Sequence, residues 1–201
     1  MNRINRVASV TLLCLLGLLA GHDVARAQVY QPYWNARAVS DDSPAMGLAV
    51  GFGEDMFRIA GHARFSMTWA SDLGLELVFD NFEDAIGDDS QLFGFGGDYK
   101  YLLVTDGTDL PFDLAAQAGF GMEFGDGDFR AMTIPFGILG SKAVPVEDGN
   151  RVITPFAGMY LVIEDTNYSD VDLSAEVRFG SAFQITGSNH AFASLHVGNG
   201  T

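Results

Sequence analysis

The sequence predicts an all-β protein, an antiparallel up-and-down β-barrel of about 8–10 strands. The first observation is residues 57–69, where apolar side chains alternate with polar or small ones. Alternate side chains point to opposite faces of a strand, so this period of two predicts a strand with one apolar face. The second observation is that the pattern recurs along the chain, and the third is that turn-forming residues separate the repeats.

Three strand candidates come first, at residues 45–53, 57–69 and 72–80. The first sets Met46, Leu48 and Val50 opposite small residues. The second sets its apolar face opposite three basic groups, and the third sets leucines opposite acidic residues. The second is long enough to cross a bilayer as a tilted strand, which needs about 9–11 residues.

The next three candidates are residues 92–103, 110–124 and 129–144. The first of them follows a long acidic loop at 81–90 and sets aromatic side chains opposite glycines and charges. The second holds apolar side chains at every other position along its length, and the third shows the same alternation more briefly. Asp-Gly-containing turns separate them, which is typical of hairpins between neighbouring strands.

The last three candidates are residues 151–163, 171–185 and 190–197. The first of them is apolar on both faces, so its orientation stays open at this point. The second alternates clearly, and the third is short. Because short turns connect consecutive candidates, we expect each strand to pair with its neighbour in the chain, which favours a barrel over a sandwich.

The domain organisation has three parts. Residues 1–27 resemble a secretory signal peptide, with a positive start, an apolar run and the small-x-small sequence Ala25-Arg26-Ala27. Residues 28–44 form an irregular lead-in or an extra strand, and residues 45–201 form the barrel domain. The single cysteine, Cys14, lies in the predicted signal peptide, so the exported chain would contain no disulfide.

The charge is strongly acidic, with 11 basic and 26 acidic residues in the whole chain. Nucleic acid is therefore an improbable partner, because phosphate binding needs a basic surface. The basic residues nevertheless gather on the polar strand faces, among acidic ones. Paired charges of this kind would suit the lumen of a narrow barrel. The candidate lumen charge network is Arg58, Arg64, Glu76, Asp98, Lys100, Asp113, Glu123, Arg130, Asp172, Glu176 and Arg178.

Alternation alone does not decide which face points outward. A membrane barrel is apolar outside and polar inside, whereas a soluble ligand-binding barrel is the reverse. Small residues on the polar faces, mixed charges, and aromatic side chains near strand ends favour the membrane barrel. Trp69, Phe79, Phe124 and Phe129 are the aromatic residues in question.

The chain resembles the small OmpA-like outer-membrane β-barrels of bacteria. The segments that carry the resemblance are Phe95-Gly96-Gly97-Asp98-Tyr99-Lys100-Tyr101-Leu102, residues 110–121, Ile134-Pro135-Phe136-Gly137 and Thr154-Pro155-Phe156-Ala157-Gly158. The family shares no catalytic residues, so the resemblance implies a fold and an outer-membrane location only.

The chain departs from the family at its end. Such barrels usually finish on an aromatic residue, whereas this sequence ends His196-Val197-Gly198-Asn199-Gly200-Thr201. An odd strand number is also unusual. Either residues 29–39 supply a further strand, or the barrel is incomplete, or one candidate is not a strand.

No catalytic residue, cofactor or metal site is predicted. His190 and His196 are too far apart along one strand to share a metal. Ser188 and His190 lack a third group for hydrolase chemistry. The acidic turns at 126–128 and 165–170 do not complete a calcium loop.

The sequence therefore predicts a non-enzymatic outer-membrane barrel with a structural, anchoring or minor pore role, whose partner is the lipid bilayer. The alternative is a periplasmic or secreted soluble barrel that binds an apolar ligand inside. Protein partners are not indicated.

Overall fold

The computed structural model of the chain describes residues 35–39, 44–52, 56–83, 89–107, 110–125, 129–146, 151–167, 169–186 and 189–198. The predicted signal peptide at 1–27 lies outside these residues, as do Ser188 and the turn at 126–128. Among the residues described, no helix is long and apolar enough to cross a membrane.

The described part of the chain is all-β, and its ten strands form one antiparallel sheet in which each long strand pairs with the next. The predicted fold class is thereby confirmed. The strands are β1 (Ala45–Phe52), β2 (Met56–Thr68), β3 (Ser71–Glu83), β4 (Asp89–Val104), β5 (Asp113–Gly125), β6 (Arg130–Ser141), β7 (Val144–Pro145), β8 (Val152–Thr166), β9 (Ser169–Thr186) and β10 (Asn189–Gly198).

All nine predicted strands are present, with corrections at their ends. The acidic loop expected at 81–90 is shorter, because β3 continues to Glu83 and β4 begins at Asp89, and the two pair as far as that point. The strand expected from residue 110 begins only at Asp113, after Pro111, which has no N–H to donate to a ladder. The two-residue β7 is a separate strand that pairs with β8.

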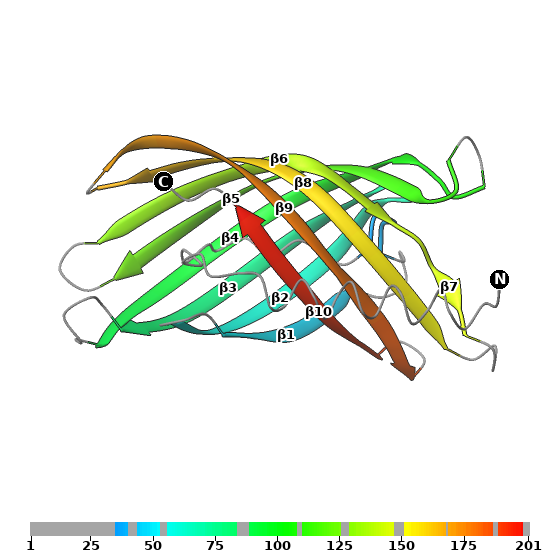
Figure 1. The fold of residues 1–201 in the computed structure, drawn as a ribbon, viewed down its shortest axis with the longest axis horizontal. Helices are drawn as coiled ribbons and strands as arrows, with labels where there is room; N and C mark the ends of the chain where they lie inside the picture. Colours follow the sequence, from blue (N-terminus) through cyan, green and yellow to red (C-terminus); the bar gives the residue numbers. More distant parts are fainter. Residues whose placement is uncertain are drawn as a thin grey trace.

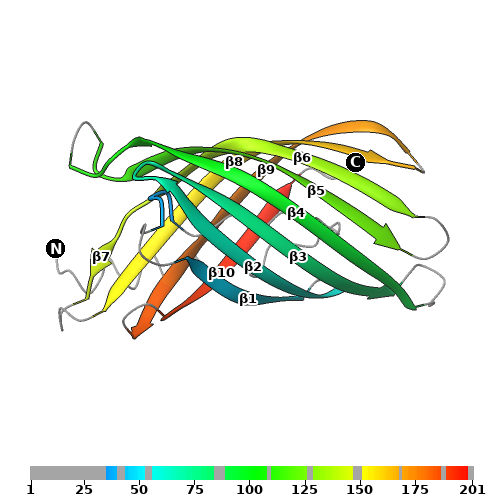
Figure 2. The ribbon, with the colours of Figure 1, turned by 180° about the vertical axis from the view of Figure 1, so that it is seen from behind.

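The sheet curls into a half-barrel, with strands strongly tilted to its long axis (Figures 1 and 2). β1 and β10 stand at the two ends of the strand order. A side chain links these edges, because Phe192 of β10 packs against a buried cluster that consists of Ala49 of β1, Ala60 of β2 and Val78 of β3. We call this junction the seam.

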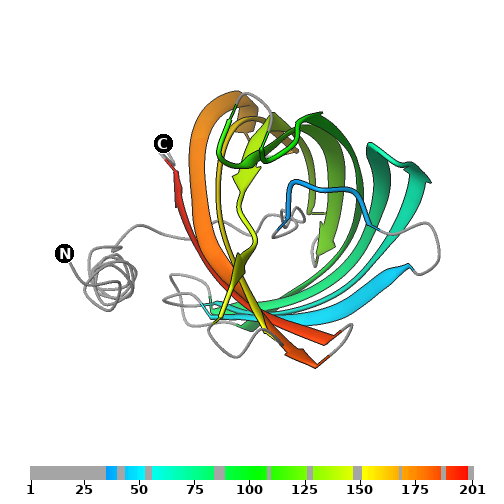
Figure 3. The ribbon, with the colours of Figure 1, turned by 90° about the vertical axis from the view of Figure 1, so that its right-hand side faces the viewer.

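The antiparallel order gives the barrel two distinct ends. The turn between β2 and β3 and the loop between β4 and β5 lie at one end, together with the start of β1. We call this the strap end, because residues 35–39, named the strap here, lie inside the barrel mouth there (blue in Figure 3). The hairpin between β5 and β6 lies at the other, far end.

The strap corrects one expectation about the lead-in. Residues 35–39 are irregular and contact the inner wall, so within the described part of the chain the segment at 29–39 supplies no extra strand. Residues 29–34 lie outside the description. Of the three explanations for the odd number of strands, an additional strand at 35–39 and a false strand candidate are therefore excluded.

Candidate functional site

The two faces of the sheet differ in polarity, with charged side chains buried on the inner face and large apolar side chains exposed on the outer face. Many inward-facing positions are charged or polar, and they include Arg64 and Arg178, both 0% exposed. The outward-facing positions are apolar, as in Leu48 at 79% and Leu77 at 58% exposed. A buried charge is tolerated only when it is paired and hydrogen-bonded, so the inner face is the candidate site.

Arg64 is the centre of the network near the strap end. Its guanidinium contacts two carboxylates, those of Asp72 on β3 and Asp98 on β4. Lys100 Nζ lies 3.3 Å from the second oxygen of Asp72. The register explains the grouping, because Asp72 is opposite Lys100 and Gly74, between Arg64 and Asp98, has no side chain to intervene. All four charged side chains are buried.

The network continues across the wall through neutral side chains. Gln117 on β5 donates to Asp98 over 2.8 Å, and Tyr160 Oη on β8 donates to Gln117 over 2.9 Å. The Arg178 guanidinium on β9 lies 4.8 Å from the centre of the Tyr160 ring, a cation–π contact. The same guanidinium donates to Glu176. One connected path therefore joins β2 to β9 along the inside of the curl.

A second cluster lies nearer the far end. Arg58 on β2 donates to both oxygens of Asp80 on β3, over 2.7 and 2.6 Å. Its Nη2 also lies 3.5 Å from Glu123 on β5. Because β2 and β5 are not neighbours in the sheet, this contact crosses the concave side and shows that the three side chains point inward. The bidentate geometry is the strongest that arginine makes with a carboxylate.

The strap adds polar groups at the strap end. The Asn35 and Arg37 carbonyl oxygens accept hydrogen bonds from Lys100 over 2.6 and 2.8 Å. Arg37 Nε donates to Asp113 over 2.7 Å. The strap therefore completes the coordination of wall charges.

Nine predicted members of the charge network are buried on the inner face. They are Arg58, Arg64, Glu76, Asp98, Lys100, Asp113, Glu123, Glu176 and Arg178. The other two lie differently: Arg130 is exposed at the far end, and Asp172 is half-buried and accepts a hydrogen bond from the Leu173 N–H. Both occupy strand positions close to the far end, where the wall no longer encloses the inward side chains.

Several network members were missed at the sequence level. Asp72 and Asp80 are buried on the inner face, although the predicted network does not include them. The strand register, in which Asp80 is directly opposite Arg58, identifies them. Gln117 and Tyr160 are uncharged, and Tyr160 belongs to the strand that is apolar on both faces. No charge pattern in the sequence marks these two residues.

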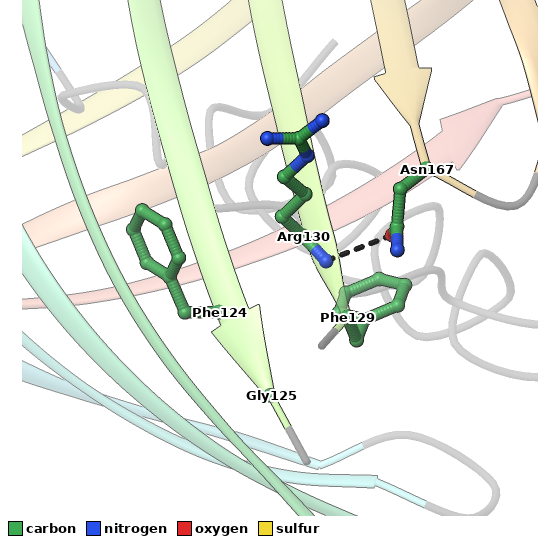
Figure 4. Close-up of a pocket in the computed structure, with 5 residues that line it drawn as sticks. All are labelled: Phe124, Gly125, Phe129, Arg130 and Asn167. Atoms are coloured by element: carbon green, nitrogen blue, oxygen red, sulfur yellow. Dashed lines mark hydrogen bonds between the residues drawn. The ribbon is translucent and has the colours of Figure 1, made fainter. Parts of the chain in front are cut away.

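An open hollow of about 540 Å³ lies at the far end (Figure 4). It is lined by Phe124, Gly125, Phe129, Arg130 and Asn167. The Arg130 backbone N–H donates to Asn167 Oδ1 over 2.9 Å, which joins the β5–β6 hairpin to the end of β8. Asn167 belongs to the acidic turn that does not complete a calcium loop, and its side-chain oxygen accepts this backbone hydrogen bond.

The histidines lie apart from one another. His62 is half-buried on β2, 6.2 Å from the Phe192 ring centre across the seam, and His190 is exposed on β10. The His196 side chain lies outside the description. Within the described ranges, no group of three or more His, Cys, Asp or Glu side chains could hold a metal ion.

The chemistry of this arrangement is mutual neutralisation. Each buried arginine faces a carboxylate, and amide, hydroxyl and backbone groups donate further hydrogen bonds to Asp98, Gln117 and Asp72. Such a network fixes side chains in place.

Comparison of the chain with known proteins found no match to a protein-family model, a curated protein or a solved structure.

Proposed function

We propose that this chain is a small outer-membrane β-barrel protein, similar to the small OmpA-like barrels, with a structural or anchoring role. The observation that carries the proposal is the inverted distribution of polarity, with paired charges inside the curl and large apolar side chains outside. Lipid is the environment that stabilises an apolar exterior, whereas water would destabilise it.

The size of the apolar exterior supports the proposal. Soluble monomers rarely expose continuous apolar patches of more than a few hundred Å². Here the outward positions of β3 alone carry Leu73, Leu75, Leu77 and Phe79, and all four are exposed. The adjacent strands continue the same surface, with Ile59 on β2 and Phe95 on β4 among the exposed side chains.

Strand length and aromatic placement fit a bilayer. Strand β3 has 13 residues. At about 3.3 Å per residue and a tilt of about 40°, such a strand rises about 33 Å, enough to cross the apolar core. Exposed Trp69, Tyr99 and Tyr101 lie near the strap end, and exposed Phe93 and Phe124 lie near the far end, as aromatic girdles would.

The interior weighs against the soluble ligand-binding alternative. A lipophilic ligand needs an apolar cavity, whereas the buried apolar clusters found among the described residues are small. One such cluster is Ala49, Ala60 and Val78. Charged and polar side chains line much of the remaining inner wall, so we expect only slight ion conduction in the resting state.

The decisive experiment is expression with the native leader, fractionation, and comparison of boiled with unboiled samples on SDS gels. We expect the protein in the detergent-extracted outer-membrane fraction, with a mobility that shifts on boiling because a closed barrel resists SDS. Recovery in the periplasm or medium, with no boiling shift, would support the soluble alternative instead.

A further inference from the structure

We propose that the strap, residues 35–39, is a displaceable plug that closes the strap end of the barrel. The inference rests on the proposed membrane location, because a plug has a function only in a barrel that separates two compartments. It adds a gated water path to a protein for which anchoring is otherwise the proposed role.

The strap occupies a specific seat on the inner wall. The Ala36 side chain is 0% exposed and packs against Ala115 on β5, Leu139 on β6 and Phe156 on β8. Its backbone N–H donates to Ser141 Oγ on β6 over 2.8 Å. The Ala36 methyl group fills an apolar socket, and the Ala36 backbone N–H is hydrogen-bonded. The two contacts together indicate that the strap is bound at this place in one defined conformation.

Polar contacts hold the strap on both sides of this socket. Arg37 pairs with Asp113 on β5, and Lys100 on β4 donates to two strap carbonyls. The Val39 N–H donates to Asp72 Oδ2 on β3 over 3.0 Å. Residue 36 of the strap contacts β6 and β8, and residue 39 contacts β3. The strap therefore runs along the inner wall from β8 to β3. Figure 3, which looks along the barrel, shows this segment inside the opening, between its middle and one side of the wall.

When the strap leaves, the ion pairs around Asp72 remain, whereas Asp113 loses Arg37 and becomes accessible to water. Lys100 and Arg64 both remain beside Asp72, and Asp113 still accepts the Asp106 N–H over 2.8 Å. Ser141 can hydrogen-bond to water instead. The strap itself has one small apolar anchor, the Ala36 methyl group. Because the wall stays intact in either case, the protein has the two states that a gate requires, one with the strap bound and one with the strap released.

The test is conductance of the full chain, refolded into planar lipid bilayers. Ala36→Glu removes the fit in the apolar socket, and Ala143→Glu, at an exposed loop position of the same end, introduces the same charge without touching the seat. We expect frequent discrete openings with Ala36→Glu, whereas wild type and Ala143→Glu stay closed almost all the time.

A second strap variant keeps the test decisive if Ala36→Glu fails to fold. Val39→Pro removes the N–H that binds Asp72 and leaves every wall residue unchanged. Loss of one hydrogen bond to a charged group should raise the open fraction by roughly tenfold or more.

Trypsin cleavage after Arg37, detected by intact mass, reports strap release independently. Both strap variants should be cleaved faster than wild type. Variants that insert and shift on boiling, release the strap and yet stay closed would overturn the plug. Variants that insert and shift but keep a protected Arg37 and a closed barrel would show that the strap is not displaceable, which also overturns it. Absence of wild-type insertion would instead contradict the membrane proposal.

Discussion

Arg64 and Arg130 occupy equivalent positions in their sequence patterns but have different environments. Both lie on the polar face of an alternating strand, and both were predicted to join the charge network. Arg64 lies between two carboxylates and is 0% exposed, whereas Arg130 is the first residue of β6 and is exposed. Alternation fixes the face on which a side chain lies. The depth of that side chain along the barrel depends on the ends of the neighbouring strands.

Arg64→Leu should destabilise the fold by about 3–5 kcal/mol, because it leaves buried carboxylates without their cation. Arg130→Leu, at an exposed position, should change stability by less than about 0.5 kcal/mol. The measurement is denaturant unfolding of the refolded protein in detergent micelles, followed by the loss of the unboiled gel band. Equal midpoints for the two variants would mean that the network contributes nothing to stability.

At the scale of the element, β3 and β8 show how far periodicity can be used. Leucines of β3 alternate with Asp72, Glu76 and Asp80, and the structure separates them into exposed and buried sets. β8 is apolar on both faces, so its sequence leaves the orientation open. In the structure Tyr160 points inward and Met159 outward, because β8 pairs with β6 and β9 in a register that sets both.

Leu77 lies at the middle of β3, on the proposed lipid face, and tests that assignment. Leu77→Arg should cost about 2–4 kcal/mol if the position lies at the bilayer midplane, because the guanidinium must enter hydrocarbon. Val144→Arg, on the exposed β7 at the strap end, should cost about 0–1 kcal/mol, as interfacial positions do.

The measurement is unfolding in lipid vesicles for both variants. A destabilisation of Leu77→Arg as small as that of Val144→Arg would place β3 in water and contradict the membrane proposal.

At the scale of the molecule, the seam is the distinctive feature. With nine long strands in simple up-and-down order, β1 and β10 run in the same direction, unlike every pair that forms a ladder in the described sheet. The edges are held together by side chains instead. Phe192 packs against the buried cluster of Ala49, Ala60 and Val78, and its ring lies beside His62.

Phe192→Ala should therefore lower the temperature at which the unboiled gel form is lost. The cost should approach, and stay below, the ~3–5 kcal/mol of a fully buried Phe→Ala, because this ring is only half-buried. Phe183→Ala is the matched control, since Phe183 lies on the outward face of β9 and is exposed. If Phe183→Ala lowered this temperature more than Phe192→Ala does, contacts other than those of the Phe192 ring would be holding the seam together.

The sequence by itself determined the all-β class, the succession of nine long strands, and most of the residues that lie on the inner face. It could do so because side-chain alternation and turn chemistry are local properties that short stretches of chain carry completely. Only the tertiary structure decided which inner residues meet, because a pair such as Arg58 and Glu123 forms through curvature and register.

The tertiary structure also decided the place of the strap. Residues 35–39 have no period and carry no motif, so the sequence left them as an irregular lead-in or an extra strand. Their seat exists only when the socket of Ala115, Leu139 and Phe156 is assembled from separate strands. A contact whose two sides lie far apart in the chain leaves no pattern in either side alone.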